Sequence, residues 1–121
     1  MNTETENRHH QRIPLNWPVI FMTPQGSIFG ETSNISVSGA HILCPQTIEN
    51  DDEFKIFLTP HEYHHMPVTC EKAWESDFYT NAFSYIAMGV RFTEISSNDR
   101  EIISLLIAES FSHPRKSMTI C

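Results

Sequence analysis

The chain has 121 residues, of which 40% are hydrophobic and 11% aromatic, a composition that supports one domain with a buried core and excludes global disorder. The formal net charge of −7 at pH 7 argues against general DNA or RNA binding, which needs a basic surface. No apolar run approaches the ~20 residues of a membrane-spanning helix, so no membrane insertion is expected. Residues 1–12 lack the apolar segment of a secretion signal, and the cytoplasm is the expected location.

The three cysteines are widely spaced and form no CxxC pair. This pattern favours a reducing compartment over a disulfide framework. Cys44 and Cys70 are expected to be buried as small apolar residues, and Cys121 to be exposed at the end of the chain.

The N-terminal part of the chain predicts a polar arm followed by two strands. Residues 1–13 are polar and show no periodicity, which is typical of a flexible arm. The apolar run 15–22 predicts a first strand, which should begin late or lie at an edge because Pro18 has no N–H to donate. Residues 27–36 predict a second strand, with a possible bulge at Gly30.

Four further strands are expected in the middle of the chain. In the segment 53–59, Phe54, Ile56 and Leu58 alternate with other residues, as in a strand with one buried face. Residues 77–81 are expected to form a loop. The other predicted strands cover 40–44, 66–74 and 83–92.

The periodicity changes near residue 96, where a C-terminal helix is predicted. Residues 96–99 offer N-cap side chains, apolar residues then recur at helical spacing, and Pro114 follows the end. Six short strands and one helix favour a closed antiparallel barrel or a sandwich, with the helix over an open end or side. The expected domain is 14–112, and 113–121 is expected to be a tail.

A polar motif interrupts the second predicted strand at its end. Asn34, Ser36 and Gly39 supply an amide, a hydroxyl and a residue that lets the backbone come close to a neighbour. Strand alternation predicts that Asn34 and Ser36 lie on the same face. The residues alone leave two interpretations open, a polar turn and a binding surface.

Two arginines, Arg8 and Arg12, are the only Lys or Arg residues before Lys55. A guanidinium group donates a fork of hydrogen bonds to phosphate oxygens or to the O6/N7 edge of guanine, and it stacks on base planes. On an acidic protein, these two side chains would form a local site for an anionic, base-bearing ligand.

The pattern Arg8-xxx-Arg12 followed by Asn34-x-Ser36-x-x-Gly39 resembles the two signatures of the PilZ domain family of bacterial cyclic di-GMP receptors. The segment 89–92 with the helix after it is similar to the last strand and helix of that family. The resemblance covers roughly residues 8–110 and implies a six-stranded antiparallel PilZ-like β-barrel with one C-terminal helix. It also implies a bacterial protein that is not an enzyme and needs no cofactor.

The resemblance further implies a binding site for cyclic di-GMP. Arg8 and Arg12 would clasp guanine and phosphate, while Asn34, Ser36 and Gly39 would line the ligand, and the arm would become ordered around it. The single expected domain carries no output module, so a downstream protein partner or a change in assembly is expected. Many relatives have an additional arginine where this chain has Asn7, which bears on affinity and on the number of nucleotides bound.

Three other interpretations remain open at this stage. The chain is alternatively a nucleotide-free adaptor of the same fold, although the arginines argue against it. The loop with His61, His64 and His65 suggests a metal-binding or catalytic barrel, but the spacing lacks a recognised zinc pattern and no metal ligand is predicted. Trp74 would be able to stack on guanine, yet a Trp at a strand end is more often packing, and it is left out of the predicted site.

Overall fold

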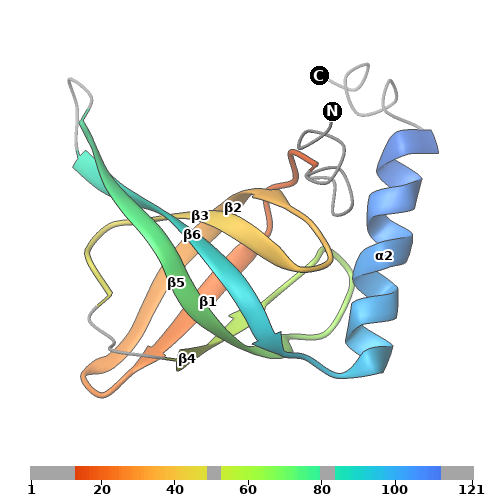
Figure 1. Ribbon diagram of the computed structural model, residues 1–121, viewed down its shortest axis with the longest axis horizontal. Coiled ribbons are helices and arrows are strands. Elements are labelled where there is room, and N and C mark those ends of the chain that lie inside the picture. Colours follow the sequence, from red (N-terminus) through yellow and green to blue (C-terminus); the bar gives the residue numbers. More distant parts are fainter. Residues whose placement is uncertain (1–12, 49–52, 80–83, 113–121) are drawn as a thin grey trace, which may run out of the picture.

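The computed structural model describes residues 13–48, 53–79 and 84–112, which form six strands and one helix (Figure 1). These strands pair antiparallel in the closed order β1-β2-β3-β6-β5-β4, and β1 closes the barrel against β4. The elements are β1 (Pro18–Thr23), β2 (Gly26–Ile35), β3 (Gly39–Cys44), β4 (Glu53–Leu58), β5 (Met66–Tyr79), β6 (Ser84–Glu94) and α2 (Ser97–Ser112). The predicted fold class is confirmed.

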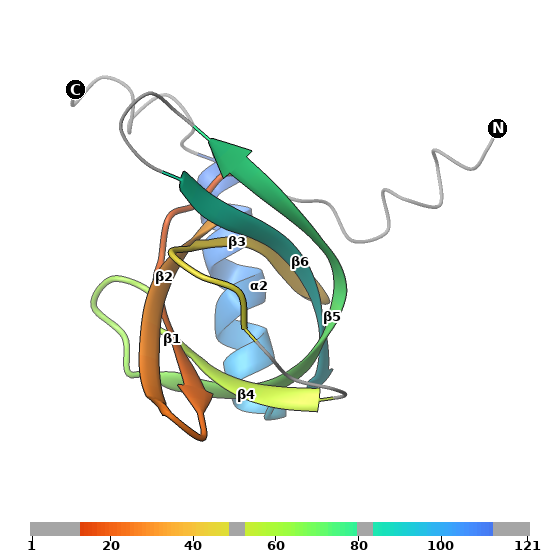
Figure 2. The same ribbon diagram turned by 90° about the vertical axis from the view of Figure 1, so that its left-hand side faces the viewer.

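The interior of the barrel is apolar because alternate residues of each strand point inward. In β4, Phe54, Ile56 and Leu58 are buried as their alternation predicts. Figure 2 shows that α2 lies across one end of the barrel, where Ile103 and Ile107 join the core cluster. The helix therefore covers an open end, one of the two arrangements expected from the sequence.

The start of α2 is held by two side-chain contacts. Ser96 is the N-cap, because its Oγ accepts a hydrogen bond from the backbone N–H of Asp99 at 3.0 Å. Asp99 is only 5% exposed, and its carboxylate contacts His64 Nε2 at 2.9 Å. The histidine loop thus has a structural role. Within the described ranges, no group of three or more His, Cys, Asp and Glu side chains is arranged to hold a metal.

Two details of the sequence prediction were wrong. The expected loop 77–81 is strand as far as residue 79, because β5 and β6 continue their pairing to Tyr79 and Ser84 beyond the rest of the barrel. The irregularity in β2 lies between Thr32 and Asn34 and not at Gly30. Gly30 is instead a close approach, since a Cβ there would meet the carbonyl oxygen of Leu43 at 2.5 Å.

The cysteines within the described residues are structural. Cys44 and Cys70 are buried and free, as predicted. Burial raises the pKa of the Cys70 thiol to about 12 and that of Cys44 to about 11, so neither forms an appreciable thiolate near neutral pH. Cys121 lies outside the described residues. In the described part of the chain, no helix combines the length and the apolar character that crossing a bilayer requires.

Candidate functional site

The N-terminal arm joins the barrel directly beside the Asn-x-Ser-x-x-Gly motif. Ile13 and Ile35 exchange two backbone hydrogen bonds of 2.9 Å. Arg8 and Arg12 lie outside the described residues, but Arg12 immediately precedes Ile13 in the chain. Five residues of extended chain span at most about 18 Å, so both arginines are tethered within reach of the motif.

The motif itself forms the tight turn between β2 and β3. The N–H of Ser36 donates to the Gly39 carbonyl at 2.8 Å, and Ser36 Oγ accepts from the N–H of Ser38 at 3.2 Å. Ser36 is fully buried, at 0% exposure. Gly39 is also buried, and a Cβ there would overlap the carbonyl oxygen of Val90. Ser36 and Gly39 therefore shape the turn from inside.

The predicted placement of Asn34 and Ser36 on one strand face was wrong. β2 ends at Ile35, so the alternation does not reach Ser36. Asn34 is half-buried at the barrel surface, whereas Ser36 points into the protein. Of the motif residues, Asn34 is the one whose side chain the structure places on the outer surface.

The same turn contacts the last strand and the helix. The N–H of Phe92 donates to the Ser38 carbonyl at 2.8 Å. Arg100 of α2 donates through Nη1 to the Val37 carbonyl at 3.4 Å. A change in the shape of the turn would therefore be felt by both β6 and α2.

Strand pairing places Asn34 in a transverse row on the outer surface of the barrel. Asn34 of β2 pairs with His41 of β3, His41 with Gly89 of β6, and Gly89 with Trp74 of β5. We call these four residues the Asn34–Trp74 row. The row crosses four strands and begins beside the point where the arm joins the barrel.

Side chains of the row contact one another over the gap left by Gly89. Asn34 Nδ2 donates to His41 Nδ1 at 2.8 Å, and the rings of His41 and Trp74 meet edge to face with centroids 5.1 Å apart. The indole lies over Gly89, where any Cβ would overlap it. Trp74 is nevertheless 42% exposed. The row thus presents a polar amide and an accessible aromatic ring on one surface.

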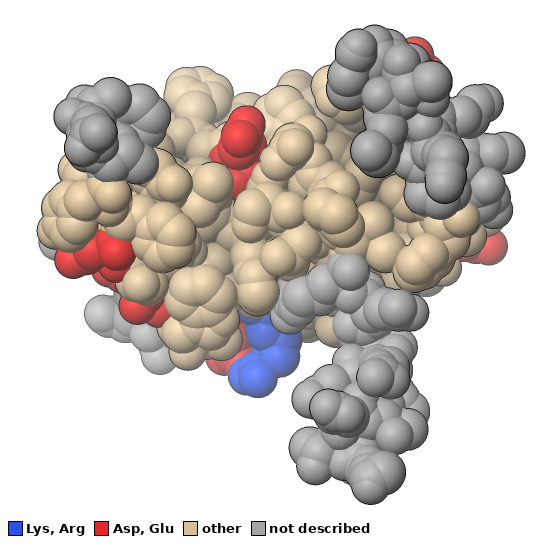
Figure 3. All heavy atoms as spheres, turned by 90° about the horizontal axis from the view of Figure 1, so that it is seen from above, with Lys and Arg blue, Asp and Glu red and all other residues tan. Residues whose placement is uncertain are grey.

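Positive charge on this side of the barrel is already paired. As far as the structure describes β2, β3, β5 and β6, their Lys and Arg residues are Lys72 and Arg91, which form ion pairs with Glu75 and Glu71. Figure 3 shows a largely uncharged face with acidic groups and with basic side chains at one edge. An anionic ligand here would depend on cations from the arm.

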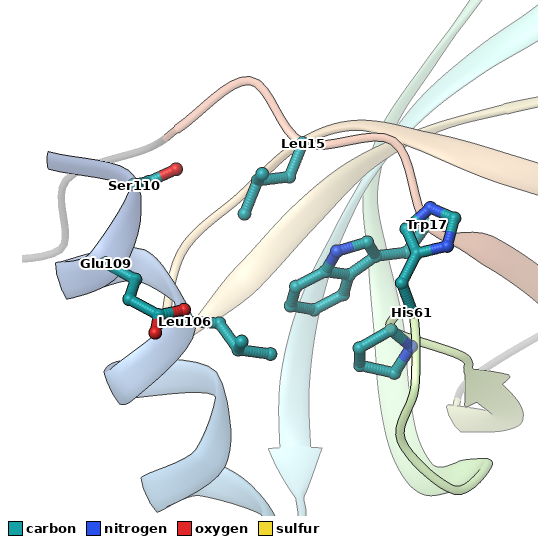
Figure 4. A pocket seen from close by; sticks show the side chains of 7 residues that line it. Leu15, Trp17, His61, Leu106, Glu109 and Ser110 are labelled. Atoms are coloured by element: carbon teal, nitrogen blue, oxygen red, sulfur yellow. The ribbon is translucent and has the colours of Figure 1, made fainter. Parts of the chain in front are cut away.

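A hollow lies between α2 and the barrel (Figure 4). Leu15, Trp17 and Leu106 form its apolar wall, and His61 and Glu109 add polar groups. Neither the motif nor the Asn34–Trp74 row lines it. This hollow is therefore separate from the site that the sequence predicts.

Sequence reasoning missed His41 and Gly89. His41 belongs to no motif, and Gly89 was noted only as the start of the segment 89–92; their place beside Asn34 and Trp74 depends on strand register. The irregularity between Thr32 and Asn34 shifts that register by one residue, so alternation along the sequence did not reveal it.

The chain belongs to the PilZ domain family, whose model matches residues 6–109. The resemblance inferred from the sequence is thereby confirmed. PilZ domains are non-catalytic and typically bind cyclic di-GMP, and the non-catalytic character of the family confirms the prediction that the chain is not an enzyme. A search of curated protein sequences finds no match.

Solved structures share the fold at low sequence identity. The PilZ domain of YcgR from Escherichia coli, solved with c-di-GMP, is 12% identical with a TM-score of 0.72, over 93% of this chain and 97% of that one. The inhibitor of motility MotI/DgrA of Bacillus subtilis is 16% identical with a TM-score of 0.71, over 89% of this chain. MrkH, a c-di-GMP-dependent transcription regulatory factor, is 15% identical with a TM-score of 0.72, over 86% of this chain. The chain spans about half the length of the last two, 53% and 51%.

A substitution at Ser36 tests whether its hydroxyl stabilises the turn. Replacing Ser36 with alanine removes the acceptor of the Ser38 N–H, which should cost about 1 kcal/mol because this group is partly accessible to water. The melting temperature should fall by roughly 4 °C. Ser38→Ala keeps the hydrogen bond from the backbone N–H of residue 38 and should lower the melting temperature less. Equal melting of both variants, measured by differential scanning fluorimetry, would contradict a structural role for the Ser36 hydroxyl.

Proposed function

We propose that this protein is a cyclic di-GMP receptor whose site combines the N-terminal arginines with the Asn34–Trp74 row. The observation that carries the proposal is the pairing of Ile13 with Ile35. It ties the arm to the end of β2, next to the row. Support also comes from family membership and from the PilZ domain of YcgR, which is described with c-di-GMP.

Each part of the proposed site has a distinct chemical task. Arg8 and Arg12 bind the phosphates and the O6/N7 edge of guanine through their guanidinium forks. Asn34, oriented by His41, hydrogen bonds to the ligand. Trp74 offers its exposed indole for stacking on a base. Ser36 and Gly39 contribute by holding the turn that positions Asn34 beside the arm.

The proposed output is a change in surface and not a reaction. The two phosphates neutralise the arginines and fix the arm over the row, so that the occupied receptor presents a surface that the empty one lacks. The contact between Arg100 and the Val37 carbonyl gives α2 a link to the same turn. A cytoplasmic protein partner would read this change.

Isothermal titration calorimetry with cyclic di-GMP tests the proposal, with GTP and cyclic di-AMP as matched controls. Saturable heat for cyclic di-GMP alone is the expected result. The stoichiometry then shows whether one nucleotide or a stacked pair is bound, which is the property that Asn7 is expected to influence. No heat, together with an unchanged melting temperature at high ligand concentration, would leave a nucleotide-free adaptor as the function.

A further inference from the structure

The outer surface of the barrel carries a second feature, an apolar groove next to the Asn34–Trp74 row. It is lined by Phe29, Leu43, Pro45 and Tyr85, with Glu31 at its side. We call it the Phe29 groove. Its floor forms where β2 and β3 approach closely at Gly30, a position where a Cβ would meet the Leu43 carbonyl oxygen.

The aromatic side chains of this region are unusually exposed for a soluble domain. Phe29 is 65% exposed, and Phe78 of β5, which pairs with Tyr85 of the groove, is 45% exposed. The ring centroids of Phe78 and Tyr85 are 5.5 Å apart, and the two rings form one continuous aromatic edge. A contiguous patch of this kind on a soluble protein typically marks an interaction surface, and aromatic residues are its usual energetic anchors.

The charge beside the groove indicates which kind of partner would bind there. Glu31 is exposed and, among the described residues, makes no ion pair. Among the described residues that line the groove there is no Lys or Arg. Two copies meeting through this face about a two-fold axis would bring the same acidic surface to both sides of the contact. Charge complementarity therefore favours a different, basic partner over a second copy.

We propose that the Phe29 groove binds a protein partner that inserts an apolar side chain flanked by a lysine or an arginine. The apolar side chain would pack between Phe29 and Tyr85, and its basic neighbour would pair with Glu31. β2 lies between β1 and β3, and β3 lies between β2 and β6. The contact with these strands is therefore made by side chains and not by addition of a strand.

This surface lies beside the proposed nucleotide site. Glu31 pairs with Leu43 and Leu43 with Ala87, which forms the next row along the barrel from the Asn34–Trp74 row. Adjacent rows on one sheet face are about 7 Å apart. Resting on the proposed function, the ligand would neutralise the two arginines of the arm, which otherwise repel the basic group of the partner, so the nucleotide would strengthen docking.

Selection from a displayed random-peptide library tests the groove. The full chain without nucleotide is the target, and its Phe29→Ser variant is used for counter-selection. Enriched peptides should carry an aromatic or aliphatic residue next to Lys or Arg. A synthetic peptide of that sequence should lose about tenfold or more in affinity to Phe29→Ser in fluorescence anisotropy. Phe111→Ser, an equally drastic change at an exposed Phe of α2, should bind it as the original chain does.

Charge reversal at Glu31 provides the second arm of the test. In the Glu31→Lys variant, selection should enrich Asp and Glu at the flanking position. Enriched peptides without a charge preference, or with equal affinity for Phe29→Ser, would overturn the proposal. So would a dimer in sedimentation that Phe29→Ser abolishes, because the groove would then hold a second copy.

The nucleotide dependence is measured separately, so that the two proposals fail independently. Saturating cyclic di-GMP should tighten peptide binding by about fivefold or more. If calorimetry shows no nucleotide binding, the proposed function fails while peptide binding to the groove still stands. If the peptide fails to bind but calorimetry shows nucleotide binding, only the groove is excluded.

Discussion

Replacing either Arg8 or Arg12 with alanine is expected to lower the affinity for cyclic di-GMP about ten- to a hundred-fold, the largest effect on binding in this protein. Each change removes charge-assisted hydrogen bonds of roughly 1.5–3 kcal/mol. The loss is not compensated elsewhere, because the described cations of β5 and β6 are already paired with Glu71 and Glu75. The melting temperature should stay nearly constant, since both residues precede the barrel.

Lysine variants separate charge from geometry. Arg12→Lys keeps the positive charge but loses the planar fork, so it should bind between the original chain and Arg12→Ala. Arg115→Ala removes an equal charge near the other end of the chain and serves as the matched control. Calorimetry at two salt concentrations should show a weaker salt dependence in the alanine variants of the arm. Unchanged binding in both Arg8→Ala and Arg12→Ala would show that the arm is not the clasp.

Local patterns were sufficient to predict most of the fold. Alternation in the segment that became β4 gave its buried face, and N-cap residues followed by helical spacing gave α2 almost to its ends. Residues 75–79 were harder, because all of them are exposed and none alternates. Their strand character comes from pairing with β6, which is a tertiary effect that no local propensity reports.

The candidate site was likewise predictable only in part. Motif residues such as Asn34 were identifiable from the sequence because their types are unusual for a strand end. His41 became part of the site only through register, and Gly89 only because Trp74 covers it. The position of one motif residue also differs from the prediction, since Ser36 was expected to face a ligand and is fully buried. On the proposed function, Ser36 would act on the ligand through the turn that it stabilises.

Gly39 and Gly89 should respond differently to substitution by alanine, and the larger loss of stability is expected at Gly39. In Gly39→Ala the new Cβ meets the Val90 carbonyl oxygen, which is part of the β3–β6 ladder and has no room to move. Overpacking of this kind costs about 1–3 kcal/mol. The melting temperature should fall by roughly 4–12 °C, with a weaker far-ultraviolet circular dichroism signal at intermediate temperatures.

In Gly89→Ala the three atoms nearest to the new Cβ all belong to the indole of Trp74, a side chain that is 42% exposed and able to turn away. The barrel should therefore melt near its original temperature, while the row loses its stacking surface. Base–aromatic stacking contributes about 1–3 kcal/mol per base, so cyclic di-GMP affinity should fall by about fivefold to a hundredfold. Trp74→Ala should reproduce this loss without adding to it in the double variant, because both changes remove the same contact. Full affinity in Gly89→Ala would exclude Trp74 from the site, and an unchanged melting temperature in Gly39→Ala would show that the β3–β6 ladder yields more easily than its geometry implies.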